Sequence, residues 1–498
     1  MRSISVILNI VTCGYIWVSY RSGNSSYVVI NATYAKLKPM YKHRYDRHGF
    51  TIVELLIVIV VIAILAALTI VAFNGINNKA KIASLQTDLT NSYKQLAIDN
   101  IKDNKYPATT AAANGGLGLK SSSGTTYEYE YDPATNLYCL TATNGSIVYS
   151  VKSNRNAPQP GGCNGGVVTT FVGSGASGTA GNPNGTGLAA ILDTPSGIAI
   201  DSSGNFYMTE GLGQRIRKIT PAGVVTTPAG PLVASSPGYA DGTGTAASFN
   251  YPSAVAADSA SGNIYVTDWG NDRIRKITPA SVVTTIAGAT SPTASVYGYV
   301  NGTGNVVRFN SVAGLAVDSS GDIYISDSAN ARIRKMTPSG VVTTFAGSGT
   351  SAHVDGTGVG ASFSGPGGMT IDASNNLYVI DGSARIRKIT PAGVVTTIGG
   401  PWGNGYSDGA GAAASFKSPM GIAVAPSGYM YVADMMNHRI RKVSPTGVVT
   451  TLAGSGTNTF ANGVSTAASF DYPVGVVLDA EGSVYVADMR NHRIRKIE

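Results

Sequence analysis

The pattern of apolar and polar residues divides the chain into stretches with different periodicities. Residues 50–73 form an almost unbroken apolar run, long enough for a helix of about 20 residues to span a bilayer core. From residue 74 to about 104, apolar side chains recur every three to five positions, which predicts an amphipathic continuation of that helix. These apolar positions are Ile82, Leu85, Leu89, Tyr93, Leu96 and Ile101. Pro107 marks the expected end of the helix or the loop beyond it.

Three strand-like runs follow the amphipathic helix, at 125–131, 137–143 and 146–152, and all are rich in Tyr, Val and Thr. Asn144-Gly145 lies between the last two runs and is a strong signal for a type I′ hairpin turn. We therefore expect a small antiparallel sheet packed on the helix, giving an α+β domain over residues 50–155. Residues 156–166 are rich in Pro and Gly and are predicted to be a linker.

The tetrapeptide R-I-R-K marks an internal repeat in the rest of the chain. It starts, at intervals of 53 to 59 residues, at Arg215, Arg273, Arg332, Arg385, Arg439 and Arg493. Each repeat contains four short apolar runs separated by Gly, Asn, Asp and Pro, which predicts four strands. A period of about 50 residues with four strands per unit is typical of β-propeller blades.

The two ends of the repeat region complement each other. Residues 167–171 match the fourth strand of a repeat without its first three, and residues 493–497 match a third strand without a fourth. Six whole blades result only if the N-terminal strand completes the last blade. We therefore predict an all-β, six-bladed propeller over residues 167–498 that its N-terminal strand closes, leaving no open sheet edge.

The formal net charge of +8 would suit a nucleic-acid partner, but the charge is unevenly distributed. Residues 1–49 hold seven Lys or Arg and one acid. Residues 50–166 hold eight basic and seven acidic residues, and residues 167–498 hold 21 and 20. The basic excess thus lies in the first 49 residues, and the propeller is not expected to bind nucleic acid.

The apolar run begins with a specific motif, Gly49-Phe50-Thr51-Ile52-Val53-Glu54, behind a basic stretch. A carboxylate deep in a membrane helix costs about 2.5–3.5 kcal/mol on insertion scales, so Glu54 needs a specific role. The motif resembles the processing site of type IV prepilins and type II secretion pseudopilins. This resemblance implies cleavage after Gly49 by a prepilin peptidase, N-methylation of Phe50, and contact of Glu54 with the free amino terminus of a neighbouring pilin during assembly.

Two other interpretations of the N-terminal segment explain fewer of its features than a prepilin motif does. A plain signal anchor leaves Glu54 unexplained, and a cleaved secretory signal has an apolar region of only about 7–15 residues. The leader of 49 residues is long for a prepilin, and a start at Met40 would shorten it to ten; the sequence leaves the choice between Met1 and Met40 open. The resemblance implies a single-pass membrane protein before assembly, then a place at the cell surface or pilus, with most of the chain extracellular or periplasmic.

Cys139 and Cys163 flank the end of the α+β domain. Because this part of the chain faces the oxidising side of the membrane, we expect them to form a disulfide bond. It would close a loop of about 25 residues and contribute about 3 kcal/mol in the loop-entropy model. Two free thiols are the alternative, and Cys13 lies in the removed leader.

The repeat resembles the NHL family, most closely at Asn437-His438-Arg439-Ile440 and Asn491-His492-Arg493-Ile494. The resemblance covers residues 167–498 and implies a propeller fold. It says less about function, since NHL propellers bind proteins, RNA or glycans and occasionally act as enzymes.

Several residue sets in the repeats are candidates for chemistry, and each has a structural explanation. His438 and His492 occupy equivalent positions, so the repeat explains them without a metal. The acid that ends each second strand is predicted to form an ion pair with R-I-R-K across the hairpin; these acids are Glu210, Asp268, Asp327, Asp381, Asp434 and Asp488. The innermost strands contain no His, Glu, Lys or Cys, so no catalytic cluster is expected in the channel, and neither a cofactor nor an enzymatic activity is predicted.

Asx-Gly pairs recur at five places in the repeat region, and we interpret them as turn formers, with calcium binding as the alternative. They are Asp241-Gly242, Asn301-Gly302, Asp355-Gly356, Asp408-Gly409 and Asn462-Gly463. The loops beside them carry exposed aromatic residues that we take as a ligand-facing rim, against the alternative that they pack on neighbouring blades. These are Tyr239, Tyr297, Tyr299, Trp402 and Tyr406.

Together these features predict a minor type IV pilin that displays a propeller as an adhesion module, with the pilus tip as its place. Its expected partners are the prepilin peptidase and methyltransferase, other pilins, the membrane, and a surface protein or glycan ligand. Two alternatives stay open: a pseudopilin-like part of a type II secretion or DNA-uptake machine, and a membrane-tethered propeller enzyme of lyase or lactonase type.

Overall fold

The computed structural model describes residues 5–11, 15–21, 52–132, 137–144, 147–153, 155–160, 166–177, 184–232, 237–289, 297–382, 384–400 and 405–498, without the side chains that precede Asn77. Contacts divide the chain into two compact units, Met1–Phe73 and Asn74–Glu498. The first unit contains a hairpin that the sequence pattern does not predict, made of β1 (Ser5–Val11) and β2 (Tyr15–Arg21).

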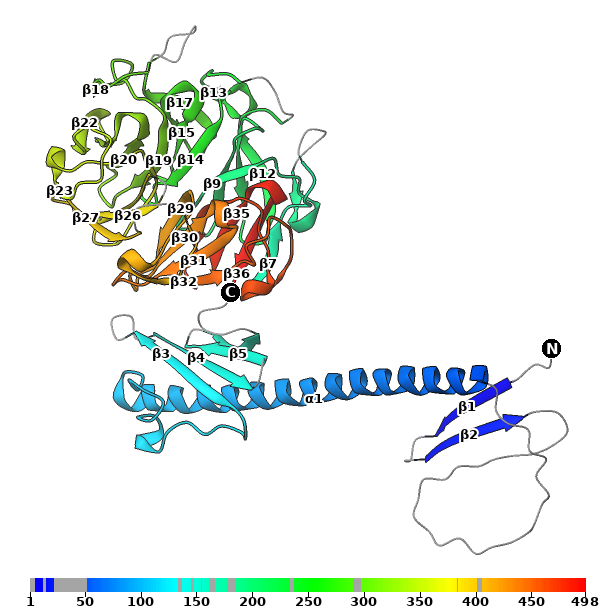
Figure 1. Ribbon diagram of the computed structural model, residues 1–498. Coiled ribbons are helices and arrows are strands. Elements are labelled where there is room, and N and C mark those ends of the chain that lie inside the picture. The colour runs from blue at the N-terminus through cyan, green and yellow to red at the C-terminus, as the bar shows by residue number, and fades with distance from the viewer. Residues whose placement is uncertain are drawn as a thin grey trace, which may run out of the picture. The chain divides into compact units, whose positions relative to one another are not determined.

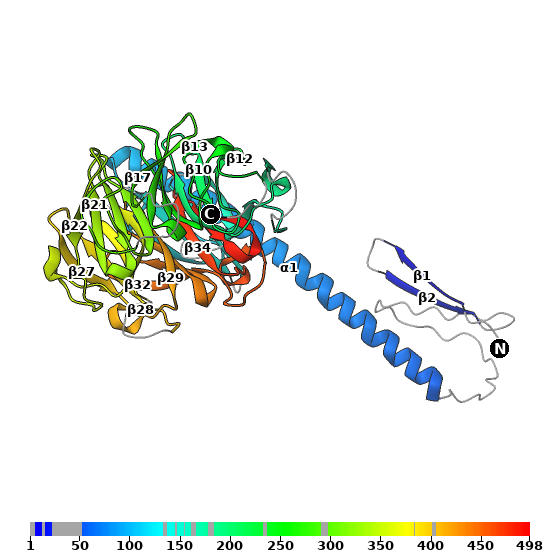
Figure 2. The same ribbon diagram turned by 90° about the horizontal axis from the view of Figure 1, so that it is seen from above.

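The predicted helix is confirmed within two residues at its start and one at its end. α1 runs from Ile52 to Asp103 and is continuous in both views (Figures 1 and 2). Where side chains are described, none of the helices has the length and apolar character needed to cross a membrane. The predicted span over residues 50–73 lies outside that part of the chain.

A four-stranded antiparallel sheet packs on the second half of α1. Its order is β3-β4-β5-β6, and the strands are β3 (Thr126–Asp132), β4 (Leu137–Asn144), β5 (Ile147–Lys152) and β6 (Arg155–Pro160). Three strands and the β4–β5 hairpin agree with the prediction. The fourth strand corrects it: residues 155–160 pair with β5, so the predicted linker is in part a strand. The residues of the predicted turn after Asn144 lie outside the described part.

The core under this sheet confirms most of the predicted helix face. Leu85, Leu89 and Leu96 are fully buried against strand residues such as Leu140. Ile101 is 84% exposed, contrary to the prediction, because a step of five residues from Leu96 turns it about 140° off the buried face.

Two buried aspartates take helix positions that the apolar pattern misses. Asp99 accepts a hydrogen bond from the backbone N–H of Asn114 (2.8 Å), and Asp88 accepts one from the N–H of Ser122 (2.9 Å). These bonds attach the segment 105–125 to the helix. The segment contains the 3₁₀ turn η1 (Asn114–Gly116).

Six sheets of five strands make up the described part of residues 166–498. The innermost strands are β9 (Pro195–Ile200), β14 (Pro252–Ala257), β19 (Val312–Val317), β24 (Pro366–Ile371), β29 (Pro419–Val424) and β34 (Pro473–Leu478). The second strands are β10 (Phe206–Glu210), β15 (Ile264–Asp268), β20 (Ile323–Asp327), β25 (Leu377–Asp381), β30 (Met430–Asp434) and β35 (Val484–Asp488). The third strands, which carry R-I-R-K, are β11 (Arg215–Ile219), β16 (Arg273–Ile277), β21 (Arg332–Met336), β26 (Arg385–Ile389), β31 (Arg439–Val443) and β36 (Arg493–Ile497).

The outer part of each sheet holds one strand more than the prediction. The fourth strands are β12 (Val224–Ala229), β17 (Val282–Ala287), β22 (Val341–Ala346), β27 (Val394–Gly399), β32 (Val448–Ala453) and β7 (Val167–Val172). The Asx-Gly segments add a two-residue fifth strand, and these are β8 (Gly185–Thr186), β13 (Gly242–Thr243), β18 (Gly302–Thr303), β23 (Gly356–Thr357), β28 (Gly409–Ala410) and β33 (Gly463–Val464). A short 3₁₀ turn follows most of them; these turns are η2 (Gly187–Ala189), η3 (Gly244–Ala246), η6 (Gly358–Gly360), η7 (Gly411–Ala413) and η9 (Ser465–Ala467).

The sheets lie around a common centre in the manner of propeller blades (Figure 1). Innermost strands of successive sheets contact one another, and β34 also contacts β9. The sheet that ends the chain takes its fourth strand from the start of the region, since β7 pairs antiparallel with β36 and β33. In five of the six sheets a Phe before the innermost strand, such as Phe309 or Phe363, is fully buried between two blades, and Leu192 takes this place before β9.

Candidate binding face

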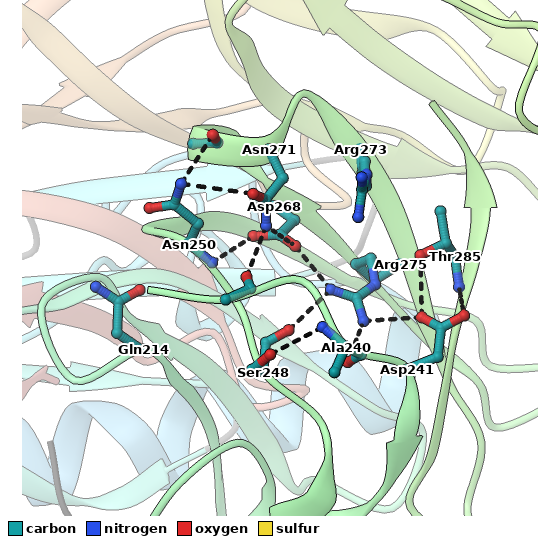
Figure 3. A network of polar contacts seen from close by, with 12 residues as sticks. Gln214, Ala240, Asp241, Ser248, Asn250, Asp268, Asn271, Arg273, Arg275 and Thr285 are labelled. Atoms are coloured by element: carbon teal, nitrogen blue, oxygen red, sulfur yellow. Dashed lines mark hydrogen bonds and ion pairs between the residues drawn. The ribbon is translucent and has the colours of Figure 1, made fainter. Parts of the chain in front are cut away.

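Every blade contains a fully buried ion pair between the last residue of its second strand and the second Arg of R-I-R-K. We number the blades in chain order, from the one that contains β9 to the one that contains β34. In blade two the pair is Asp268 Oδ2 with Arg275 Nη1 at 2.7 Å, and both side chains are wholly inaccessible (Figure 3). The equivalent pairs, at 2.5–2.8 Å, are Glu210–Arg217, Asp327–Arg334, Asp381–Arg387, Asp434–Arg441 and Asp488–Arg495. These contacts are the cross-hairpin ion pairs that the sequence pattern predicts.

The register shows which Arg makes the pair. Asp268 lies directly opposite Arg273, the first Arg, yet its carboxylate reaches the guanidinium of Arg275, two residues further on the same face of the strand. Glu210, whose side chain is one methylene longer, contacts both arginines of its blade, Arg215 and Arg217. Burial raises the pKa of Asp488 to about 6 despite the opposing charge of Arg495, because desolvation disfavours the ionised carboxylate.

The same arginine also fixes the Asx-Gly segment. Arg275 Nη2 donates to Asp241 Oδ1 at 2.9 Å, and Asp241 accepts further bonds from the N–H (3.0 Å) and hydroxyl (2.9 Å) of Thr285 (Figure 3). Asp355 and Asp408 repeat this arrangement with Arg387 and Arg441. The Asx residues therefore hold the fifth strand, and the residues described contain no group of three or more His, Cys, Asp or Glu suited to a metal ion.

The second-to-third strand hairpin and the loop before the fifth strand lie on one side of each blade, which we call the hairpin face. In blade two, the amide of Asn271 donates to Asp268 and to the carbonyl of Gly238, joining hairpin and loop. These hairpins contain the 3₁₀ turns η4 (Trp269–Asn271), η5 (Ser328–Asn330), η8 (Met435–Asn437) and η10 (Met489–Asn491). The hairpin face is thus presented by a rigid, buried polar network.

The predicted aromatic rim lies on the hairpin face, but three of its members pack on arginines of their own blade. The rings of Tyr239, Tyr299 and Tyr406 lie 5.0, 4.0 and 3.9 Å from the guanidinium carbon of the first Arg, and they remain 41–46% exposed. Tyr297 is 69% exposed, and Trp402 lies outside the described residues. These three rings therefore contact arginines of their own blade, and a ligand-facing rim stays a prediction.

Two further rings contact an arginine or a carboxylate of the ion-pair hairpins, and the rim predicted from the sequence does not include them. Phe460 lies 3.9 Å from Arg493, and His353 donates or accepts through Nδ1 at 2.9 Å from Asp381. Both stand two residues before the Asx of their repeat, as Tyr299 and Tyr406 do, and this spacing is the signal that would have found them.

His438 and His492, the two histidines of the NHL-like motifs, each join two neighbouring blades. His438 Nδ1 accepts a hydrogen bond from the N–H of Tyr472 at 3.4 Å, and His492 Nδ1 accepts one from the N–H of Thr194 at 3.3 Å. Gln214 and Asp272 accept the same bond from the N–H groups of Tyr251 and Ser311. The repeat geometry therefore accounts for these histidines.

The centre of the blades is narrow and holds no group for acid–base chemistry. A cavity of about 120 Å³ is lined by Ser, Gly, Ala, Val, Ile, Leu and Met of the six innermost strands. At its wall, a Cβ on Gly475 would overlap the carbonyl oxygen of Ser196, and one on Gly197 would overlap that of Ser253. Glycine is required there because the innermost strands approach so closely.

The predicted processing motif is not among the side chains that the structure describes. Gly49 and Phe50 lie outside the described residues, and so does the side chain of Glu54 on α1. Cys139 on β4 is disulfide-bonded, while Cys163 lies outside the described residues, so the pairing of these two cysteines stays a prediction.

Comparison with known proteins agrees with both halves of the chain. A model of the prokaryotic N-terminal methylation motif matches residues 44–70, and a model of the NHL repeat matches residues 249–277, 309–336 and 470–497. The type IV wide pilus major component PilA4 of Thermus thermophilus is 35% identical over 94 residues, 19% of this chain and 71% of that protein. The chain belongs to the type IV pilins and carries NHL repeats in its C-terminal part.

Relatives of the repeat region show the fold and no more. Human NHL repeat-containing protein 2 is 30% identical over 298 residues, 53% of this chain and 41% of that protein, so the chain spans less than half of this relative. A crystal structure of a protein of unknown function from Bacteroides thetaiotaomicron has a TM-score of 0.51 and 21% identity, covering 72% of this chain and 84% of that one.

Proposed function

We propose that this protein is a minor type IV pilin that displays a six-bladed propeller as a binding module. A prepilin peptidase cleaves after Gly49, Phe50 becomes N-methylated, and the apolar half of α1 holds the protein in the membrane before assembly. Glu54 then meets the amino terminus of a neighbouring pilin. The observation that carries this proposal is the methylation motif at residues 44–70 in one chain with NHL repeats.

The propeller in this proposal is closed by its first strand. Three contacts support closure: β7 pairs with β36, β34 contacts β9, and Thr194 of blade one donates to His492 of blade six. A closed ring leaves each blade with only a two-residue strand at its outer edge, which offers little to other chains and suits a domain displayed outside the cell.

A binding role accounts for the hairpin face better than a catalytic one. The buried Arg–carboxylate pairs hold its loops in place, and the cavity at the centre is small and lined without titratable side chains. An enzyme of lyase or lactonase type would need an acid–base or metal group near a substrate pocket. The ligand in the proposal is a surface protein or glycan.

The size of the propeller favours the pilus tip as the place of this pilin in the proposal. A domain of 332 residues has a radius of gyration of about 20 Å, and so a diameter of roughly 50 Å. Subunits of a pilus shaft stack much more closely than that, so a propeller on every subunit would collide with its neighbours.

Immunogold labelling of the propeller on sheared pili tests this placement. Label at one end of the fibre is expected, and uniform label along the shaft would contradict the tip position. In parallel, pili with and without this protein are compared for adhesion to cells. Tip label without any difference in adhesion, but with loss of secretion or DNA uptake on deletion, would instead favour the machine component.

A further inference from the structure

The junction between blades five and six carries a set of titratable side chains that the other five junctions lack. At each junction, the residue before a third strand meets the residue before the innermost strand of the next blade. Here these residues are His438 and Tyr472, whose rings lie edge to face at 5.3 Å. The corresponding pairs elsewhere are Gln214 with Tyr251, Asp272 with Ser311, Ala331 with Gly365, Ala384 with Ser418, and His492 with Thr194.

An exposed arginine completes the set. The guanidinium carbon of Arg490, in the hairpin of blade six, lies 3.7 Å from the centroid of the Tyr472 ring. Its side chain makes no hydrogen bond or ion pair with the residues that the structure describes, whereas Arg439 and Arg493 donate to backbone carbonyls. Stacking on Tyr472 orients the planar guanidinium and leaves its N–H groups available to a ligand. At the matching hairpin position blade three carries Ala329.

The charges around this junction favour an anion. Arg490, Arg439 and Lys417 are near enough to oppose protonation of His438, and Asp471 is near enough to favour it. Burial is the largest cause of the lowered pKa of His438, and the three cations add to it against the effect of Asp471. With a neutral imidazole, these four charged groups sum to an excess of positive charge on an exposed surface.

Asp471 adds a hydrogen-bond acceptor to the same place. Its Oδ1 is buried 3.7 Å from His438 Nδ1, but the side chain as a whole is 18% exposed and accepts no hydrogen bond from the described residues, so its other oxygen is the one that a ligand can reach. The guanidinium of Arg490 can donate to an oxyanion, and the carboxylate of Asp471 can accept from a hydroxyl. Together they match a ligand that carries both groups. Sugars with a carboxylate or a phosphate group have this combination.

We propose that Arg490, Tyr472, His438 and Asp471 form a binding site for an anionic sugar on the hairpin face. Arg490 binds the oxyanion through its guanidinium N–H groups, and Asp471 accepts a hydrogen bond from a sugar hydroxyl. The proposal rests on the binding role inferred above and names the ligand class for it. A carboxylate on a uronic acid and a phosphate on a sugar share this chemistry.

The test is a ligand-observed NMR titration of the full mature chain in detergent with glucuronate, glucose 6-phosphate and glucose. Binding of one or both anionic sugars and not of glucose is expected, and the anion that binds identifies the source. Arg490→Ala should weaken binding roughly tenfold or more, because a charge-assisted hydrogen bond is lost. Arg308→Ala removes the same charge at another junction and should leave binding unchanged.

Equal binding of glucose, or Arg490→Ala binding like the parent chain, would overturn the proposed site. Failure of the site and failure of the adhesion role are separable. If pili adhere to cells equally well with Arg490→Ala and the sugars do not bind, the site is wrong and adhesion stands. If the sugars bind through Arg490 but the pili do not adhere, the site stands and adhesion is wrong.

Discussion

His492, near the end of the chain, accepts a hydrogen bond at 3.3 Å from the backbone N–H of Thr194, in the first blade. The two residues are 298 positions apart, yet their contact repeats the His438–Tyr472 bond between consecutive blades. His492 adopts a left-handed backbone conformation (φ 51°), as does Ala331 at the same place in another blade (φ 52°). The last and first blades therefore meet through the same hydrogen bond as blades five and six.

The completing strand β7 should be essential to the last blade. Val168 is fully buried between Ile497 and Gly463, so Val168→Asp places a carboxylate in an apolar core without a partner. We expect a loss of about 3–5 kcal/mol in unfolding free energy, or aggregation. Thr169→Asp, on the exposed face of the same strand, is the matched control and should melt like the parent chain. Thermal melts followed by circular dichroism measure both.

Deletion of residues 167–172 is the stronger version of this experiment. It should leave β36 and β33 with unpaired edges and cause aggregation or loss of the cooperative melt. A deletion variant that stayed monomeric with unchanged thermal stability would refute the closed ring.

The buried ion pairs should be strongly destabilised by removal of one partner. Arg334→Met leaves Asp327 buried without its cation, and an unpaired buried charge costs about 3–5 kcal/mol. The double variant Asp327→Asn with Arg334→Met removes the charge and should recover part of the loss in urea unfolding. Arg308→Met, an exchange at a partly exposed arginine, is the control. If Arg334→Met were as stable as the parent chain, the ion pair would make no contribution to the unfolding free energy.

The stability of the last blade should depend on the ionisation of Asp488. Its pKa rises from 3.8 to about 6 on folding, so the folded chain retains a proton that the unfolded chain has lost between these values. The resulting contribution is fully present below pH 3.8 and is lost as the pH rises through about 6. It amounts to about 3 kcal/mol at most.

Asp488→Asn cannot titrate and isolates this effect. The unfolding free energy of the parent chain, relative to the variant, should decrease between pH 4 and pH 7 by up to about 3 kcal/mol. A difference independent of pH would mean that Asp488 stays ionised throughout.

Processing should depend on Gly49 and assembly on Glu54. Gly49→Val should block cleavage, and the intact mass of the membrane-extracted protein should otherwise correspond to a chain that begins at methylated Phe50. Glu54→Ala should still be cleaved but should enter pili poorly, since a neighbour's amino terminus then lacks its partner in an apolar setting. A mature N-terminus elsewhere would contradict the proposed pilin processing.

The sequence predicted the frame of each blade well, because turn residues and strand periodicity are local signals. The second and third strands and the acid that ends each second strand follow directly from the repeat. It did not reveal the fifth strand that follows Asp241 and its equivalents, since a two-residue strand has no periodicity and Asp241 holds it through a partner, Arg275, 34 residues away. Ile101 was misplaced because three-to-five spacing was counted without following the helical angle.

The rim aromatics show a different limit. Tyr299 and Tyr406 are exposed loop residues by any composition rule, yet each stacks on an arginine that comes later in the chain. Hydrophobic patterning cannot distinguish a ring that awaits a ligand from one that shields a guanidinium. Arg490 drew no notice in the sequence because its significance depends on Tyr472, which lies in the preceding loop of the same blade.

The pairing of β7 with β36 has a mechanical consequence. The chain passes from the pilin part into the propeller at residue 166, directly before β7, so any tension between a pilus and a captured ligand enters the blades through this strand. β7 lies between β33 and β36, and its ladder of hydrogen bonds would carry the load as a whole. In the proposed ring, the strand that completes the last blade is thus also the tether, and the force at which it detaches would set the pull that the attachment withstands.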